Sequence, residues 1–181
     1  MQEKIGKVTL DYEFYPGEDL YSDGPVEEEL LEIARSYGEE ELNRVIAEKN
    51  SWPVLYHFSH IRGNIVSWLP ITKEDKVLEI GAGCGAISGV LCRNAKRVVA
   101  NDLSKRRSTI NAYKNQDASN LEIMVGNFNV VAEKMEERFD YVTRETAPYV
   151  EWLGIQENPY GGGWAAGKDY GSKLRKILAD L

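Results

Sequence analysis

The sequence has few of the residues that build disulfide-rich or metal-binding proteins. It contains two cysteines and two histidines in 181 residues. Cys84 and Cys92 fall in an expected loop and the helix after it, where a disulfide would distort the helix, so we expect two free thiols in a reducing compartment. The histidines, His57 and His60, are three positions apart without a third ligand at helical spacing, so no metal site is expected.

Long apolar runs are also missing. No uninterrupted run approaches the length that crosses a membrane. Met1 is not followed by the basic and then apolar segments of a secretory signal. We therefore expect a cytoplasmic protein without a membrane partner.

Positive charge is scarce, with 22 lysines and arginines against 29 acidic residues and a net charge of -7. A general nucleic-acid binder needs a basic face, so nucleic acid is expected to be an unlikely partner. Hydrophobic residues make up 43% of the chain, which indicates a folded globular protein.

The stretch from Lys76 to Asp102 organises the chain. An apolar run at residues 77–80 predicts a buried parallel strand, and the glycines that follow it favour a turn. Apolar residues at helical spacing then predict a helix from about Cys84 to Asn94, after which a second strand leads to Asp102. The pattern is a strand–glycine loop–helix–strand unit.

The spacing of the glycines separates two kinds of nucleotide site. Gly81, Gly83 and Gly85 read G-x-G-x-G, whereas dinucleotide sites require G-x-G-x-x-G, and Ala86 stands where the third glycine would be. A nicotinamide-dependent dehydrogenase is therefore disfavoured.

Two acidic residues flank this loop. Asp102, at the end of the second strand, can accept hydrogen bonds from both hydroxyls of a ribose. Glu79 would repel a phosphate and suits a ligand with a positive charge. The alternative is a glycine-rich turn in an ordinary α/β domain, with both carboxylates merely solvated.

This arrangement resembles the first motif of the class I S-adenosylmethionine-dependent methyltransferases, an acidic residue followed by a spacer and G-x-G-x-G. The segment Leu55–Asn111 is similar to bacterial methyltransferase domains found with cell-surface glycosyltransferases. The resemblance implies a Rossmann-like three-layer α/β/α sandwich with a mostly parallel sheet and a helical N-terminal extension. It also implies the cofactor S-adenosyl-L-methionine. We expect methyl transfer to a small-molecule or glycan-linked acceptor. The alternative is a non-catalytic S-adenosylmethionine-binding module, or a fragment of a larger methyltransferase or glycosyltransferase protein.

The resemblance assigns the cofactor contacts. Leu103 covers one face of the adenine, Asn127 accepts a hydrogen bond from its amino group, and the Phe128 backbone meets a ring nitrogen. Arg62 could bind the carboxylate of the cofactor, or it could be a surface arginine. The expected cofactor-binding residues are Glu79, Gly81, Ala82, Gly83, Cys84, Gly85, Asp102, Leu103, Asn127, Phe128 and Arg62.

Residues 1–70 are expected to form an N-terminal extension and a helical lid, and residues 71–181 the cofactor-binding domain. The extension begins with a strand at residues 8–14 and continues with two helices, whose acidic runs are read as solvated faces. Apolar residues at 61, 65, 68 and 69 predict a helix that folds over the glycine loop. The basic residues at 105–107 are expected to face solvent.

A catalytic base cannot be assigned from the sequence. Methyl transfer needs orientation above all, and a hydroxyl acceptor also needs a general base. The candidates are Glu145 and Tyr149, which follow the expected fourth strand, and His57 or His60 from the lid.

The pattern of strands and helices breaks after the fourth strand, predicted at residues 139–142. Residues 143–181 contain no further β-branched run, so the last strands of the fold are expected to be missing. The unpaired edge of the fourth strand predicts a possible homodimer, unless residues 143–181 fold back over this edge.

Overall fold

The computed structural model describes residues 1–19 and 22–144. Their strands form one six-stranded sheet in the order β1-β2-β5-β4-β3-β6. The strands are β1 (Gln2–Ile5), β2 (Val8–Asp11), β3 (Lys76–Ile80), β4 (Arg97–Asp102), β5 (Leu121–Val125) and β6 (Tyr141–Arg144). The helices are α1 (Val26–Ser36), η1 (Glu39–Glu41), α2 (Leu42–Lys49), α3 (Trp52–Phe58), η2 (His60–Ile65), α4 (Ser88–Asn94), α5 (Lys105–Lys114) and α6 (Phe128–Lys134).

Strand β3 lies between β4 and β6 and is parallel to both. Residues 77–80 are all buried, which explains why this strand reads as a continuous apolar run. Strand β5 extends the sheet beyond β4, again in parallel. The predicted fold class, a mostly parallel α/β sheet, is confirmed.

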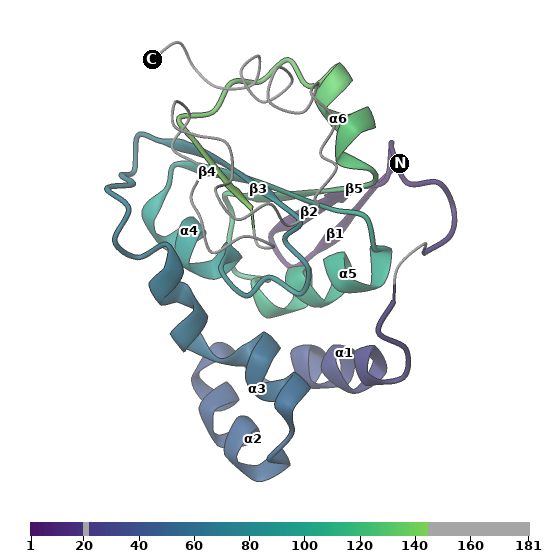
Figure 1. Cartoon of the computed structure of the whole chain (residues 1–181), viewed down its shortest axis with the longest axis vertical. Coiled ribbons are helices and arrows are strands. Elements are labelled where there is room, and N and C mark those ends of the chain that lie inside the picture. Colours follow the sequence, from purple (N-terminus) through teal and green to yellow (C-terminus); the bar gives the residue numbers. More distant parts are fainter. Residues whose placement is uncertain (20–21, 145–181) are drawn as a thin grey trace, which may run out of the picture.

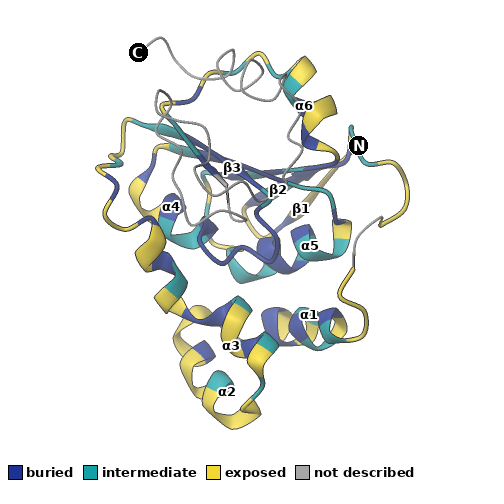
Figure 2. Ribbon diagram, viewed as in Figure 1, coloured by how far each residue is buried: buried dark blue, intermediate teal, exposed yellow. Residues whose placement is uncertain are grey.

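The helices form layers around this sheet. Figure 1 shows α4 and α5 on one face and α6 on the other, with α1, α2 and α3 stacked beyond α5. The central strands and parts of α4 and α5 are buried in Figure 2. A separate apolar cluster joins the outer helices to the glycine loop and α5; it consists of Leu30, Ile33, Ala34, Leu42, Val45, Val54, Phe58, Cys84 and Ile110. The N-terminal helices are thereby packed directly onto the element that follows Asp102.

The N-terminal hairpin of β1 and β2 was only half predicted. The expected strand at 8–14 is β2, and β1 pairs with it in antiparallel fashion across Gly6, whose φ is +57°. Strand β2 then runs parallel to β5, so residues 2–11 belong to the same sheet as the glycine loop. The proposed domain boundary at residue 70 stays a prediction, but the sheet contains strands from both sides of it.

Two predicted helices differ in the structure. Helix α4 begins at Ser88 and not near Cys84, because Gly85 has a φ of +74°, which a right-handed helix cannot contain. The apolar face predicted around Ile61, Ile65 and Trp68 points outward, with exposed fractions of 62%, 44% and 63%. In place of the helix predicted over residues 61–69, the chain forms the 3-10 helix η2, which ends at Ile65.

Several expectations lie outside the described residues. Glu145 and Tyr149 are among them, as is the tail that would lack the final strands. The strand edge predicted to form a homodimer belongs to β6, the last strand in the sheet order, and dimerisation stays a prediction. Within the described residues, no helix is long and apolar enough to cross a membrane.

The two cysteines are free and buried, as expected. Burial, with a contribution from the charge of Glu79, raises the pKa of the Cys92 thiol to about 12. Since the thiolate is the reactive form, we expect Cys92 to resist a thiol-specific reagent at pH 8 in the folded chain and to react after unfolding in urea. Mass spectrometry of the labelled peptide measures this. Rapid labelling of native Cys92 would contradict the buried position.

Candidate functional site

The glycine loop joins β3 to α4 at the carboxyl ends of the parallel strands. Gly81, Gly83 and Gly85 have φ values of +70°, +53° and +74°, a region that side chains rarely allow. The backbone N–H groups of Gly81 and Ala82 donate to the Asn101 carbonyl at 2.8 and 3.0 Å. The loop is therefore fastened to the end of β4. A Cβ built on Gly81 would meet no atom of the described residues within 4 Å, so its backbone borders open space.

Asp102 is held in place by the backbone on both sides of it. Its Oδ2 accepts from the Gly83 N–H at 2.8 Å, and its Oδ1 accepts from the Ser104 N–H at 2.9 Å. Burial raises the pKa of Asp102 above its usual value, and the two backbone donors and the charge of Arg107 oppose this effect. A carboxylate has about four acceptor sites, so both oxygens can still accept a hydroxyl group. The sequence predicted this juxtaposition of loop and carboxylate.

Glu79 lies beneath the loop with no exposed surface. Its Oε2 accepts from the Ser88 hydroxyl at 2.6 Å, and that hydroxyl accepts from the Asn111 Nδ2 at 3.0 Å. Glu79 thus connects β3 to α4 and α5. A Cβ on Gly85 would lie 2.2 Å from the Asn111 Oδ1, so this chain of contacts also explains the third glycine. An electrostatic effect of Glu79 on a cationic ligand stays a prediction.

The three residues expected around an adenine differ in how far their side chains are exposed. Leu103 is partly buried beside Asp102. Asn127 is exposed, but its Oδ1 accepts from the Asn129 N–H at 2.9 Å and caps α6, so the proposed adenine contact would share this acceptor. The Phe128 side chain is buried in the core, which leaves its backbone for a ligand. The same holds for Cys84.

The predicted lid is connected to the glycine loop through Lys114 of α5. Its Nζ donates to the His57 carbonyl at 2.9 Å and to the Gly85 carbonyl at 3.0 Å. This ammonium therefore ties the end of α3 to the glycine loop. His60 is exposed and contacts Asn43 at 3.2 Å, so the two histidines do not converge.

His57 is neutral at pH 7. Burial, with the nearby charges of Arg107, Arg62 and Lys114, lowers its pKa from 6.5 to about 4. Its Nδ1 is buried and has no hydrogen-bond partner among the described residues. Because burial disfavours the protonated imidazole, His57 is a weak base here, and its role as a catalytic base stays a prediction.

The lowered pKa of His57 predicts a pH effect on stability. Unfolding restores a pKa near 6.5, so the unfolded chain binds more protons and stability should fall as the pH drops from about 6.5 toward 4. Urea unfolding at pH 7 and pH 5 tests this. His57→Gln should reduce the fall in unfolding free energy between pH 7 and pH 5. The matched change at exposed His60, His60→Gln, should leave this fall unchanged. Equal pH dependence in both variants would contradict the burial of a neutral His57.

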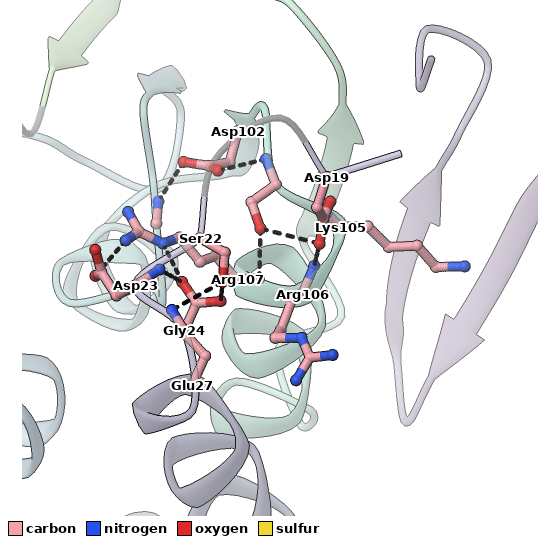
Figure 3. Close-up of polar contacts among 11 residues, drawn as sticks. Asp19, Ser22, Asp23, Gly24, Glu27, Asp102, Lys105, Arg106 and Arg107 are labelled. Atoms are coloured by element: carbon pink, nitrogen blue, oxygen red, sulfur yellow. Dashed lines mark hydrogen bonds and ion pairs between the residues drawn. The ribbon is translucent and has the colours of Figure 1, made fainter. Parts of the chain in front are cut away.

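The basic residues at the start of α5 do not all face solvent, which corrects the sequence-based expectation. The Arg107 side chain is 14% exposed, and its Nε donates to the Glu27 Oε1 at 2.8 Å. Glu27 is 1% exposed, so the acidic run of α1 is not simply a solvated face. Arg107 also pairs with Asp23 (Figure 3), and Arg106 pairs with Glu28.

The N-terminal segment also caps α5. Asp19 accepts from the backbone N–H groups of Lys105 and Arg106 at 2.6 and 3.1 Å. Figure 3 shows these contacts next to Asp102. Sequence reasoning missed Asp19, Glu27 and Arg107 because the partners are about 80 positions apart.

Arg62 lies against an aromatic ring of α3. Its guanidinium is 4.1 Å from the centre of the Tyr56 ring. Binding of a cofactor carboxylate by Arg62 stays a prediction. Within the described residues, no three histidine, cysteine or acidic side chains are arranged to hold a metal ion.

Comparisons with known proteins agree with this geometry. A family model described as "Tellurite resistance protein TehB" matches residues 45–149, which is more than half of the chain. Ribosomal RNA small subunit methyltransferase A from Lachnoclostridium phytofermentans is 36% identical over 83 residues, which cover 42% of this chain and 29% of that protein. The corresponding enzyme from Lysinibacillus sphaericus is 30% identical over 96 residues, which cover 50% of this chain and 33% of that protein.

The chain spans about a third or less of the length of these curated relatives. Among solved structures, an S-adenosylmethionine-dependent methyltransferase from Thiobacillus denitrificans in complex with S-adenosyl-L-homocysteine has a TM-score of 0.46 and 16% identity. The match covers 87% of this chain and 53% of that one. The family match over residues 45–149 confirms the resemblance to class I methyltransferases and the expected class of cofactor.

The expectation that nucleic acid is an unlikely partner was wrong, because the two curated relatives are ribosomal RNA methyltransferases. The net charge of the whole chain does not describe the charge of any one surface. With its central match over residues 45–149 and its glycine loop closed by Asp102, the chain belongs to the TehB family.

Proposed function

We propose that the chain binds S-adenosyl-L-methionine at the loop between β3 and α4 and transfers its methyl group to an acceptor. The position of Asp102 carries this proposal. Its carboxylate is fixed by the Gly83 and Ser104 backbone and keeps acceptor sites for two ribose hydroxyls. The open space beside Gly81 lets a ligand approach the loop closely.

The chain's own residues would act mainly by orientation. When bound, S-adenosyl-L-methionine supplies a methyl group on a positively charged sulfur. Asp102 and the loop would fix the nucleoside, and Lys114 would hold α3 against the loop so that an acceptor meets a defined surface. If the acceptor has to lose a proton, we expect little help from His57, because burial disfavours its protonated form.

Two acceptor classes are supported by different observations. The resemblance of Leu55–Asn111 to domains found with glycosyltransferases favours a small-molecule or glycan-linked acceptor. The ribosomal RNA methyltransferases among the relatives favour RNA. A non-catalytic binding module is the less favoured alternative, because the relatives are named as methyltransferases.

The test is methyl transfer from S-adenosyl-L-methionine that carries a labelled methyl group, with the full chain offered RNA, nucleotide sugars and simple amines and phenols. We expect label in one class of acceptor and its loss when Asp102 is replaced by alanine. Tight binding of S-adenosyl-L-homocysteine without transfer to any acceptor would support the non-catalytic alternative. No binding at all would contradict the proposed function.

A further inference from the structure

Acidic residues are distributed very unevenly along the chain. The chain has 29 of them, but residues 49–73 contain none. The same stretch contains Lys49, Arg62 and Lys73. It forms α3, η2 and the connection into β3, and it contributes no negative charge of its own to an acidic protein.

This region also carries most of the exposed large apolar side chains of the described residues. Six of the eight are found between residues 52 and 68; they are Trp52, Leu55, Tyr56, Ile61, Ile65 and Trp68. Trp52 is 72% exposed and Trp68 is 63% exposed. Tryptophan is seldom left so open, and a cluster of such residues marks an interaction site.

Two of the rings and one cation form a connected group. The Trp52 and Tyr56 rings are 6.0 Å apart, with an angle of 37° between their planes. The Arg62 guanidinium lies 4.1 Å from the Tyr56 ring centre. We call Trp52, Tyr56 and Arg62 the ring platform. Flat side chains of these kinds are the surfaces on which unpaired bases stack.

The ring platform is connected to the candidate cofactor site. The Tyr56 ring meets the His57 ring edge-on at 4.9 Å, and the His57 carbonyl accepts from Lys114, which also binds the Gly85 carbonyl. Lys114 thus joins the residue next to Tyr56 to the glycine loop, so an RNA strand on the platform would lie near this loop.

We propose that the ring platform binds single-stranded RNA and that RNA is the acceptor of the methyl group. This inference rests on the proposed function and names its substrate class. Bases would stack on Trp52 and Tyr56, and a neighbouring phosphate would lie near Arg62. The lack of acidic residues in 49–73 lets a polyanion approach a chain whose net charge is -7.

A membrane surface fits this region less well. Recognition of anionic lipids uses clusters of about four to eight lysines and arginines. Residues 49–73 contain three, of which Lys49 is paired with Glu29 at 3.0 Å. Stacking of bases on exposed rings needs fewer charges, and the ring platform offers two rings and one cation.

Fluorescence anisotropy with a labelled single-stranded RNA of mixed sequence tests the inference on the full chain. We expect Trp52→Ala and Tyr56→Ala each to weaken binding by about tenfold, since stacking on one ring is lost. Trp52→Phe should retain most of the affinity. Val130→Ala, which removes an exposed apolar side chain on α6, is the matched control and should change nothing. We expect few phosphates to be neutralised. A plot of the logarithm of the binding constant against the logarithm of the salt concentration should therefore have a slope of only about −1.

The outcomes separate this inference from the proposed function. Unchanged RNA affinity in Trp52→Ala and Tyr56→Ala would overturn the platform, as would binding to anionic vesicles in preference to RNA. Binding of S-adenosyl-L-homocysteine, measured by calorimetry in Trp52→Ala, should stay intact. If the parent chain binds this nucleoside but no RNA, the inference is wrong and the cofactor site stands. If it binds RNA but no S-adenosyl-L-homocysteine, the proposed function is wrong and RNA is not a methyl acceptor.

Discussion

S-adenosyl-L-homocysteine should bind the Asp102→Ala variant at least about tenfold more weakly than it binds the parent chain. The substitution removes a charged acceptor from the ribose, and hydrogen bonds to charged groups contribute about 1.5–3 kcal/mol. It also releases the Gly83 and Ser104 N–H groups, which are held at 2.8 and 2.9 Å, so the loop should lose its fixed shape. Both effects act in the same direction.

Isothermal titration calorimetry measures this loss. Asp140→Ala is a suitable control, because Asp140 also accepts a backbone N–H, from Lys76 at 2.8 Å, but does so at the amino end of β3. That variant should bind the ligand as the parent does. If Asp102→Ala binds as tightly as Asp140→Ala, the ribose assignment is wrong.

Glu27→Ala should lower the free energy of unfolding by about 3 kcal/mol, the low end of what is lost when one partner of a buried ion pair is removed. The reason is that Arg107, 14% exposed, would keep its charge without its most deeply buried partner. Glu27 also accepts from the Ser22 hydroxyl at 2.8 Å and the Asp23 N–H at 3.1 Å, so the start of α1 would loosen as well. Glu29→Ala on the same helix is the control. Glu29 pairs with Lys49 at the surface, with 39% and 45% of the side chains exposed, and its loss should cost under about 1 kcal/mol.

Acid should act on the same ion pair. Burial tends to raise the pKa of Glu27, but its hydrogen bonds to Arg107, Asp23 and Ser22 lower it below 4.5 overall. The contribution of Glu27 to the free energy of unfolding is therefore complete above pH 4.5. It is lost as the pH falls through the pKa of Glu27 in the folded chain. Urea unfolding at pH 7 and pH 3 should show a smaller acid effect in Glu27→Ala than in the parent. Equal unfolding free energies for Glu27→Ala and Glu29→Ala at pH 7 would contradict the buried pair.

The parts of the fold that were predictable are those encoded by neighbouring residues. The apolar runs of β3, β4 and β5 and the alternate glycines are local signals, and they are enough to predict that Asp102 lies beside the loop. Strand β5 begins and ends where the alternation of apolar residues predicts, at Leu121 and Val125.

The parts that were missed depend on contacts between distant residues. Glu27 and Arg107 each look like one charge in a polar run, and only the packing of α1 on α5 makes them a buried pair. Strand β1 is short and mostly polar, and it is defined by its pairing with β2. In η2, the helical spacing of Ile61 and Ile65 was read as a buried face, but the chain turns these residues outward.

The expectation about partners failed for a related reason. Net charge is a sum over the chain, and recognition depends on where the charges lie. Arg106 and Arg107 are neutralised by acidic residues of the N-terminal segment, whereas residues 49–73 carry no acidic residue at all. The position of the charges, and not their total, bears on whether RNA can bind.

A crystal structure of the chain with S-adenosyl-L-homocysteine tests the central claim most directly. The account predicts both ribose hydroxyls within hydrogen-bond distance of the Asp102 carboxylate and the nucleoside against the backbone of the glycine loop. A ligand seated elsewhere, for example in the cavity of about 350 Å³ lined by Tyr37, Asn115 and Ser119, would contradict it.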